Sequence, residues 1–397
     1  MKVLLSAFDC GPGRGSEPGN GWHWAITLAD FGHEVTVLTG HNNRQLISAV
    51  DSHGIDFQFI DLPASPLHRF SQTLGWADIY RHWQEKALVH SKGLTKKYDV
   101  VHHVTWGSLR LGSDLWRLPI PLVYGPIGGG QTAPAEYWRY FGPEWPAETL
   151  RTASTGPMLV LNSRSRETIR NSAVVLATNS ATMAACRRLG ATDVRYMLAE
   201  GLPTEWLVDP RPRPTGIPVV LWVGRLLRLK APTLAIQAFA ELRRVMPARL
   251  IVAGDGPARG QVLSAVKRLR LDEDVQLLGH VPWDEIRGLY DSASVLLFTS
   301  LRDSSGAQFL EALGRGLPAV ALDHHGIADA DVGPAALKVA LPPDPHELPG
   351  RLASALETIL CDDEWESRSA AAVKWAAEHT WPAKAAAATQ IYHEVVR

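Results

Sequence analysis

Short runs of apolar residues recur along the chain, separated by longer stretches in which apolar residues return with helical spacing. Continuous apolar runs are typical of parallel strands that are buried on both faces of a sheet. The pattern predicts strands at 3–8, 34–39, 57–60, 99–104, 121–124 and 173–178, and again at 219–223, 250–253, 275–278, 295–299 and 319–322. Strands that alternate with helices in this way indicate an α/β protein with parallel sheets.

The chain is long enough for two such sheets, because its 397 residues exceed what one hydrophobic core usually supports. The segment 210–216 is polar and dense in proline, which is typical of a linker. We therefore predict an N-terminal domain at 1–209, a linker at 210–216, a C-terminal domain at 217–380 and a final helix at 381–397. Ligands of open α/β sheets bind at the carboxyl ends of the strands, so we expect both sets of strand ends to face one interdomain cleft.

The composition limits the kinds of binding partner and the cellular compartment that we expect. Lys and Arg total 40 against 41 Asp and Glu, so the near-zero net charge gives no reason to expect nucleic acid or another strongly charged partner. An odd number of cysteines, three, fits a reducing compartment. No apolar run approaches the roughly 20 residues that a membrane span needs, and the apolar start of the chain is too short for a signal peptide. We expect a cytoplasmic protein.

Two pairs of charged residues in the second half suggest what the chain binds. Gly224-Arg225 follows one predicted strand and Lys230 comes shortly after, so two cations can face one anionic ligand. Small residues follow Asp303 just ahead of a helix that we expect to begin near Ser305. The free N–H groups at a helix start suit phosphate, and Glu311 lies about 9 Å further along the helix. One end of this site suits anions and the other suits hydroxyl groups.

These motifs, taken in order, resemble those of the retaining glycosyltransferases of GT-B family 4. The chain carries Gly224-Arg225 with Lys230, then Gly254-Asp255-Gly256-Pro257, Leu278-Gly279-His280-Val281, and the stretch from Asp303 to Glu311-Ala312. The similarity is strong from about 219 to 326 and weaker elsewhere. Asp303 stands where the family usually has the first glutamate of its Glu-x7-Glu motif, and Asp329 stands where a Gly-Ile-Pro-Glu turn usually has glutamate. Because the family's first glutamate contacts the sugar, aspartate at position 303 puts the sugar specificity in question.

The resemblance implies a GT-B fold, in which two Rossmann-like domains face a cleft and the helix 381–397 crosses back onto the first domain. It implies transfer of a sugar from a nucleoside diphosphate sugar, with UDP or GDP expected, to an acceptor hydroxyl with retention of configuration. The C-terminal domain would bind this donor and the N-terminal domain the acceptor. No cofactor and no metal are expected. Polysaccharide, glycolipid and glycosylated natural-product biosynthesis are the expected settings.

The same resemblance assigns roles in the second half. Arg225 and Lys230 would be catalytic, because fixed cations stabilise the charge that develops on the leaving diphosphate. Glu311 would accept hydrogen bonds from the nucleotide ribose. Asp303 would hold hydroxyls of the transferred sugar or would cap the following helix. The remaining donor-binding residues would present backbone groups: Gly224, Gly254, Val281, Ser304, Ser305, Gly306 and Ala307.

The first half carries weaker signals. Gly15 and Ser16 lie near an expected helix start and would contact the donor phosphates, or would only permit a sharp turn. Family members often have His-x-His where this chain has His102-His103, so a catalytic histidine is expected there. Successive strand residues point to opposite faces, so at most one of them faces the cleft, with His103 favoured and the other in the core. The glycines after the next strand are assigned to the acceptor: Gly128, Gly129 and Gly130.

The acceptor is expected to be a carbohydrate, a lipid-linked sugar or a small molecule. Residues 138–170 hold two tryptophans and five arginines, which could give weak peripheral membrane contact. Four glutamates at 136, 144, 148 and 167 favour a solvated helical face instead.

Three alternative interpretations each have a sequence feature against them. Asp329-Ala330-Asp331 has the form of a metal-binding Asp-x-Asp but lies past the last main strand, so we do not assign a metal to it. A nicotinamide-dependent dehydrogenase is an alternative on Gly11-x-Gly13, although no acidic residue follows the second strand for an adenosine ribose. A catalytically silent sugar-binding relative is the third, and Arg225 with Lys230 weighs against it.

Overall fold

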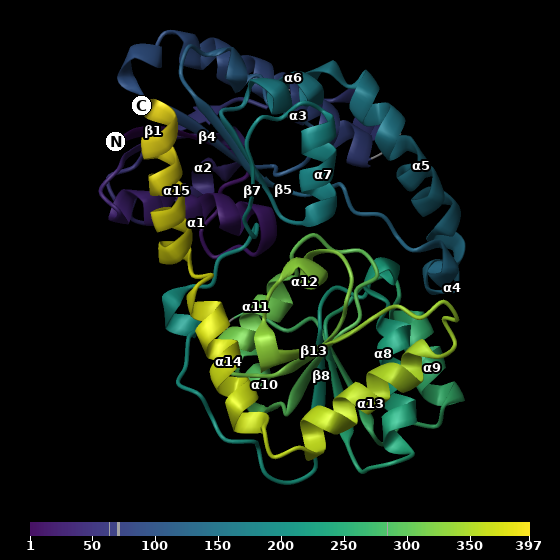
Figure 1. Ribbon diagram of the computed structural model, residues 1–397. Coiled ribbons are helices and arrows are strands. Elements are labelled where there is room, and N and C mark those ends of the chain that lie inside the picture. The colour runs from purple at the N-terminus through teal and green to yellow at the C-terminus, as the bar shows by residue number, and fades with distance from the viewer. Residues whose placement is uncertain (63, 70–71, 284) are drawn as a thin grey trace. The chain divides into compact units, whose positions relative to one another are not determined.

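The computed structural model describes residues 1–62, 64–69, 72–283 and 285–397. The chain forms two compact units, which are coloured by position along the sequence in Figure 1. Unit 1 contains Met1–Gly130, Ser154–Gly201 and Trp381–Arg397, and unit 2 contains Gln131–Ala153 and Leu202–Thr380. This division departs from the predicted one, because 131–153 and 202–209 pack with the second unit.

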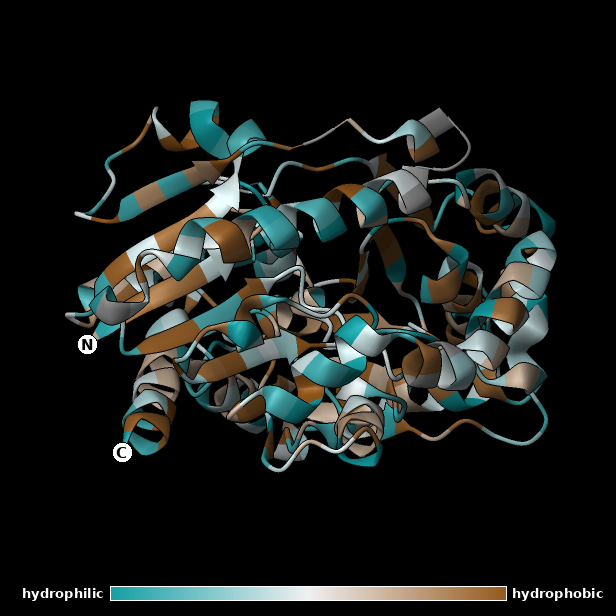
Figure 2. Ribbon diagram, turned by 90° about the horizontal axis from the view of Figure 1, so that it is seen from above, coloured by the Kyte–Doolittle hydropathy of each residue, from teal (hydrophilic) through white to brown (hydrophobic). Residues whose placement is uncertain are grey.

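Within the described residues, unit 1 is built on a seven-stranded parallel sheet of order β3-β2-β1-β4-β5-β6-β7. Its strands are β1 (Lys2–Ala7), β2 (Glu34–Gly40), β3 (Asp56–Ile60), β4 (Val100–Thr105), β5 (Leu122–Ile127), β6 (Val174–Ala177) and β7 (Val194–Tyr196). The central strands are buried along almost their whole length, and most of the strand ribbon is hydrophobic (Figure 2). Continuous apolar runs form such strands because helices cover both faces of the sheet.

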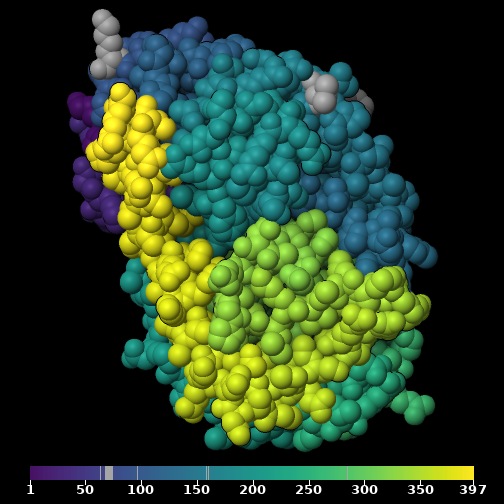
Figure 3. All heavy atoms as spheres, in the orientation of Figure 1, coloured from purple at the N-terminus to yellow at the C-terminus, as the bar shows by residue number. Residues whose placement is uncertain are grey.

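Alternation along β1 shows the two faces of this sheet. Val3 and Leu5 join one apolar cluster, which includes Trp24 and Tyr392, and Leu4 joins another, which includes Trp83. The first cluster packs under α1 (Ser16–Asp30), α2 (Arg44–Ile47) and α15 (Trp381–Val396); the second packs under α3 (Gln72–Lys92), α6 (Ser163–Asn171) and α7 (Ser180–Arg188). The outward side of α15 forms part of the surface of unit 1, where it is yellow in Figure 3.

The described part of unit 2 contains a six-stranded parallel sheet of order β10-β9-β8-β11-β12-β13. Its strands are β8 (Val219–Val223), β9 (Arg249–Ala253), β10 (Val275–Gly279), β11 (Val295–Phe298), β12 (Ala319–Leu322) and β13 (Ala336–Val339). The helices α8 (Pro232–Arg243), α9 (Arg259–Arg268) and α13 (Leu348–Cys361) lie on one side of it, and α10 (Ile286–Ser292), α11 (Ala307–Gly314) and α14 (Trp365–Ala377) lie on the other (Figure 1). The short α12 (Gly326–Asp329) follows β12. The two parallel sheets confirm the predicted α/β class.

The 131–153 segment belongs to unit 2 although it follows a strand of unit 1. It contains α4 (Trp138–Phe141) and the first half of α5 (Trp145–Leu161). Tyr137, Tyr140 and Phe141 are buried in the apolar core of unit 2. The Tyr137 hydroxyl donates to the Pro342 carbonyl at 2.8 Å, and the Tyr140 hydroxyl donates to Gln237 at 2.9 Å. Three buried aromatic rings therefore fix this segment to the second sheet.

Candidate functional site

The strand order of unit 2 reverses between β8 and β11, which extend the sheet in opposite directions. Ligands of open α/β sheets bind outside the carboxyl ends of the strands at such a reversal. The predicted cations follow β8 and the predicted acidic pair follows β11. The sheet therefore brings the two sequence-predicted groups of this unit to the same edge.

Close contact between backbones builds the loops at this edge. A Cβ atom on Gly254 would lie 1.9 Å from the Gly224 carbonyl oxygen, and Gly254 N–H donates to the Gly279 carbonyl at 2.7 Å. Gly254 has a φ of 142°, which other residues rarely adopt. Three consecutive strand ends are thus tied together by backbone alone.

Lys230 reaches this edge from a short 3-10 helix, Arg228–Lys230. Its side chain passes Gly224, and its Nζ lies 2.8 Å from Oδ2 of Asp303. Arg225 is exposed, and across the described residues its guanidinium has no ion-pair or hydrogen-bond partner. The lysine is fixed by a carboxylate, whereas the arginine is open to solvent.

Asp303 does not cap the helix that follows it. Its Oδ1 accepts a hydrogen bond from Ser304 N–H at 2.9 Å, and its Oδ2 faces Lys230. The helix α11 begins at Ala307, two residues later than expected, and its N-cap is Gly306 in the left-handed region. The capping alternative is therefore wrong for this structure, while contact with a sugar stays a prediction.

Glu311 lies on α11 with both carboxylate oxygens already oriented. Oε2 accepts from the buried Tyr290 hydroxyl at 2.8 Å, and Oε1 lies 3.3 Å from Nε1 of Trp283. The Trp283 indole is 46% exposed and stacks on Trp206 with ring centres 4.5 Å apart. These contacts fix the carboxylate, which retains lone pairs for a further donor. Its ribose contact stays a prediction, as does the donor contact of half-buried Val281.

The two histidines on β4 of unit 1 are both fully buried. Nδ1 of His102 accepts from the Tyr392 hydroxyl at 2.6 Å, and its Nε2 donates to the Gly125 carbonyl at 2.8 Å. His103 lies on the other face, where Nδ1 is 2.9 Å from Ser6 Oγ and Nε2 is 3.1 Å from Tyr80 Oη. Neither ring lies open at the strand end, so the catalytic role of either histidine stays a prediction.

Burial sets the charge of these imidazoles. It lowers the pKa of His102 to about 3 and that of His103 to about 4, since removing the ring from water disfavours its charged form. The Gly125 carbonyl opposes the shift at His102, and the Trp106 carbonyl opposes it at His103. Both rings are therefore neutral at pH 7 and lie hydrogen-bonded in the core of unit 1.

The glycine-rich loop after β1 leads directly into α1. Gly15 is the N-cap, with no side-chain hydrogen bond, and exposed Ser16 has a φ of 58°. Glu17 lies in the first turn, where burial raises the pKa of its carboxyl to about 8, so the side chain is mostly neutral at pH 7. The structure therefore leaves both the phosphate-contact and the turn interpretations open.

The glycines after β5 are used for packing within unit 1. Gly128 exchanges backbone hydrogen bonds with Gly107 and Leu109 at 3.0 and 2.8 Å. A Cβ atom on Gly130 would lie 2.7 Å from the backbone of Thr182, at the start of α7. Gly129 has a φ of 116°. Acceptor contact by these three residues stays a prediction, because close packing already explains two of them.

Comparison with known proteins decides the family. Residues 217–362 match the model of glycosyl transferases group 1, and residues 22–200 match that of the glycosyl transferase 4-like domain. Both models are glycosyl transferase models, and their matches follow one another along the chain. The chain belongs to the group 1 glycosyltransferase family. This membership displaces the dehydrogenase alternative.

Individual relatives of this glycosyltransferase agree. A D-inositol 3-phosphate glycosyltransferase from Corynebacterium jeikeium is 33% identical over 197 residues, which are 46% of this chain and 46% of the relative. Among solved structures, a sucrose-phosphate synthase from Thermosynechococcus elongatus has a TM-score of 0.71 at 18% identity, covering 99% of this chain and 98% of the other. HepE from Anabaena, solved in complex with UDP, has a TM-score of 0.65 at 17% identity, covering 98% and 100%. The last two show the GT-B fold.

Sequence reasoning missed three residues at the edge of the second sheet of the glycosyltransferase. Arg302 precedes Asp303, Glu148 lies in the 131–153 segment, and His325 follows β12. The Arg302 Nε lies 3.2 Å from Oε1 of Glu148, and the His325 Nε2 lies 2.6 Å from the Thr132 carbonyl oxygen. No local pattern signals these contacts, because they join segments that are far apart along the chain.

The arginines considered for membrane contact are engaged with protein groups. Arg164 pairs with the nearly buried Asp114 at 3.0 Å, and Arg151 pairs with Glu148 at 2.7 Å. Trp138 is 57% exposed. No helix in the described ranges combines the length and apolar character that crossing a membrane demands. The same ranges contain no cluster of three or more His, Cys, Asp or Glu that could hold a metal, around Asp329 or elsewhere.

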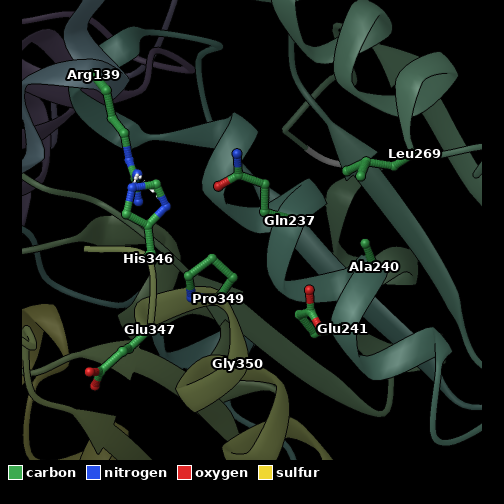
Figure 4. Close-up of a pocket in the computed structure, with 9 residues that line it drawn as sticks. All are labelled: Arg139, Gln237, Ala240, Glu241, Leu269, His346, Glu347, Pro349 and Gly350. Carbon is green, nitrogen blue, oxygen red and sulfur yellow. Dashed lines mark hydrogen bonds between the residues drawn. The ribbon is translucent and has the colours of Figure 1, made fainter. Parts of the chain in front are cut away.

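A separate cavity of about 450 Å³ lies among α8, α13 and the 131–153 segment in unit 2 (Figure 4). Arg139 and His346 point toward each other at its rim, with the arginine Nη1 3.0 Å from the imidazole nitrogens. Glu241 and Glu347 also line it. None of the predicted donor residues does, and its mixed charges differ from the paired cations after β8.

Proposed function

We propose that this glycosyltransferase moves a sugar from a nucleoside diphosphate sugar to an acceptor hydroxyl, with retention of configuration and without a metal. The observation that carries the proposal is the meeting of Lys230 and Asp303 at the reversal of the second sheet, beside the exposed Arg225. A cation held by a carboxylate and a second cation open to solvent suit a diphosphate joined to a sugar.

Arg225 and Lys230 would stabilise the negative charge that develops on the diphosphate as the bond to the sugar breaks. The first turn of α11 adds free N–H groups beside the same strand ends. With no carboxylate assigned as a nucleophile, the acceptor hydroxyl would attack from the face that the diphosphate leaves. The leaving phosphate would then take the hydroxyl proton, so catalysis consists of positioning and electrostatics.

UDP and GDP sugars are the expected donors, and HepE, which shares this fold, binds UDP. The acceptor is expected to be a carbohydrate, a lipid-linked sugar or a small molecule. The relative that acts on D-inositol 3-phosphate supports a polyhydroxylated acceptor, and the alignment covers 46% of that relative. Weak peripheral membrane contact remains part of the proposal only for a lipid-linked acceptor.

Calorimetric titration with UDP, GDP and ADP tests the donor side, followed by transfer assays that pair the bound nucleotide's sugars with a panel of hydroxylated acceptors. We expect one nucleoside diphosphate to bind and its sugar to appear on an acceptor with unchanged anomeric configuration. Absence of binding by all three nucleotides, or an inverted product, would contradict the proposal.

A further inference from the structure

The 131–153 segment contacts the candidate donor site as well as the core of unit 2. Besides its buried tyrosines, it is held by an ion pair between Glu144 and Arg228, whose Oε1 and Nε lie 3.1 Å apart. Arg228 opens the 3-10 helix that ends at Lys230. The segment is therefore attached to the loop that carries the two predicted catalytic cations.

Glu148 makes the first contact with the loop after β11. Its carboxylate is 8% exposed and accepts from Arg151 Nε and Nη2 at 3.0 and 2.7 Å. Arg302 approaches the same Oε1 at 3.2 Å as an ion pair, with an N–H that is not aligned for a hydrogen bond. Two guanidinium groups thus share one nearly buried carboxylate, and removing its charge weakens both contacts. Arg302 is the chain neighbour of Asp303.

His325 makes the second contact. Its Nε2 donates to the Thr132 carbonyl at 2.6 Å, and its ring packs against His324 with centres 3.6 Å apart. Its backbone has φ 51° and ψ −133°, a conformation that favours glycine. Strain of this kind persists where the surroundings hold it, and it gathers at functional sites.

Gly326, the chain neighbour of His325, contacts the 302–305 loop directly. A Cβ atom on Gly326 would lie 2.2 Å from the Ser304 carbonyl oxygen, so the loop after β12 packs directly on the backbone next to Asp303. Asp303 in turn holds Lys230. The two contacts therefore hold the 302–305 loop at the residues on either side of Asp303, which are Arg302 and Ser304.

We propose that Glu148 and His325 are positioning residues for the donor site, which fix the 302–305 loop against the 131–153 segment and thereby hold the Asp303–Lys230 pair in place for the donor sugar. This inference rests on the proposed function. It means that part of the donor selectivity is encoded in a segment that precedes the rest of unit 2 in sequence.

Glu148→Gln tests the first contact, because glutamine keeps the size of the side chain and removes its charge. The matched control is Glu136→Gln, an exposed glutamate in the same segment. Hydrogen–deuterium exchange of peptides spanning 299–306 in the apoprotein should be faster in Glu148→Gln and unchanged in the control. Equal exchange in the two variants would overturn the inference, whatever the activity of the protein.

Kinetics with the accepted donor provide the second measurement. Glu148→Gln should raise the donor KM or lower kcat by at least about tenfold, within the roughly hundredfold that a small misplacement of a reacting group can cost. Its effect should be non-additive with Asp303→Asn, since both act on one loop. Additive effects would overturn the inference. If wild-type protein binds no nucleoside diphosphate, the proposed function fails, while the exchange experiment still decides the inference.

His325→Gly tests the second contact without unfolding the loop, because glycine accepts the observed backbone conformation. We expect a melting temperature at or above that of the wild type, together with a raised donor KM and an altered ranking of donor sugars. His325→Ala keeps the strain and should lose stability as well. Wild-type donor KM and ranking in His325→Gly would overturn the role of this residue.

Discussion

The Nζ atom of Lys230 lies 2.8 Å from Oδ2 of Asp303, and both side chains are about four-fifths buried, with 17% and 20% exposed. The pair joins the loop after β8 to the loop after β11 across the reversal of strand order. It holds one cation at a fixed position, whereas the neighbouring Arg225 remains exposed. The two predicted catalytic cations therefore differ in exposure and in whether a carboxylate holds them.

Replacing either cation with alanine should slow turnover by roughly a hundredfold or more, since one donor to a developing negative charge typically contributes about 2.7–4 kcal/mol. Steady-state kinetics of Arg225→Ala and Lys230→Ala measure the effect, with circular dichroism to establish that each variant is folded. Arg244→Ala, at a guanidinium with 70% exposure, is the control and should retain full activity. Wild-type turnover in either site variant would remove that residue from the mechanism.

Asp303→Glu should alter the ranking of donor sugars, because the longer side chain reaches about 1.5 Å further toward the sugar. We expect kcat/KM for the natural donor to fall about tenfold, which is ~1.4 kcal/mol. Affinity for the free nucleoside diphosphate should stay nearly constant, since Glu311 is held separately by Tyr290. An unchanged donor ranking, with weaker nucleotide binding instead, would mean that Asp303 acts only by holding Lys230.

Chelators should leave activity unchanged, because Arg225 and Lys230 supply the positive charge that a metal would otherwise bring to the diphosphate. The measurement is the transfer rate before and after dialysis against EDTA. Loss of activity that magnesium or manganese restores would show that a metal takes part.

The buried histidines of β4 should make unit 1 less stable in acid. Their folded-state pKa values, about 3 for His102 and about 4 for His103, lie below the ordinary value of 6.5. As pH falls below 6.5, the unfolded chain binds protons that the folded chain does not. The contribution of the two histidines to the free energy of unfolding is therefore complete above pH 6.5 and is lost as the pH falls toward 4. Each histidine contributes a slope of up to about 1.4 kcal/mol per pH unit.

Urea denaturation followed by tryptophan fluorescence at pH 4.5, 5.5 and 7.5 checks this dependence. His102→Gln should lower stability at pH 7.5, where its two hydrogen bonds are lost, and should give a shallower decline between pH 6 and pH 4.5. The exposed His90 provides the control His90→Gln, which should follow the wild type. An identical acid slope in His102→Gln would show that this imidazole is accessible to protons in the folded state.

The strands of both sheets were largely predictable from apolar runs, and β8 and β12 coincide with their predicted ranges. Two strands were missed, β7 and β13, which are short, lie at sheet edges and are only partly buried. Edge strands carry weaker apolar signals because one side faces solvent. The strand β5 also runs on through Gly125-Pro126, where the sequence suggested an end.

The residues assigned to the donor could be picked out because the loops that carry them follow apolar strands, and their binding role stays a prediction. Contacts between them were not, since Lys230–Asp303 and Glu148–Arg302 depend on how separate loops meet. The 131–153 segment was placed in the first domain because continuity along the chain is the default assumption. That assumption fails here because three aromatic residues of the segment are buried in unit 2: Tyr137, Tyr140 and Phe141. The type of a residue does not indicate which of two cores its ring will join.

The path of the backbone between the two units constrains how such enzymes can be recombined. The chain passes from one unit to the other after Gly130, after Ala153, after Gly201 and after Thr380. A hybrid spliced at the proline-dense linker would carry a foreign 131–153 segment against a native donor loop, with Glu148 and Arg302 drawn from different parents. If the proposed role of Glu148 holds, exchange of sugar selectivity between homologues requires a graft of that helical segment together with the second half of the gene.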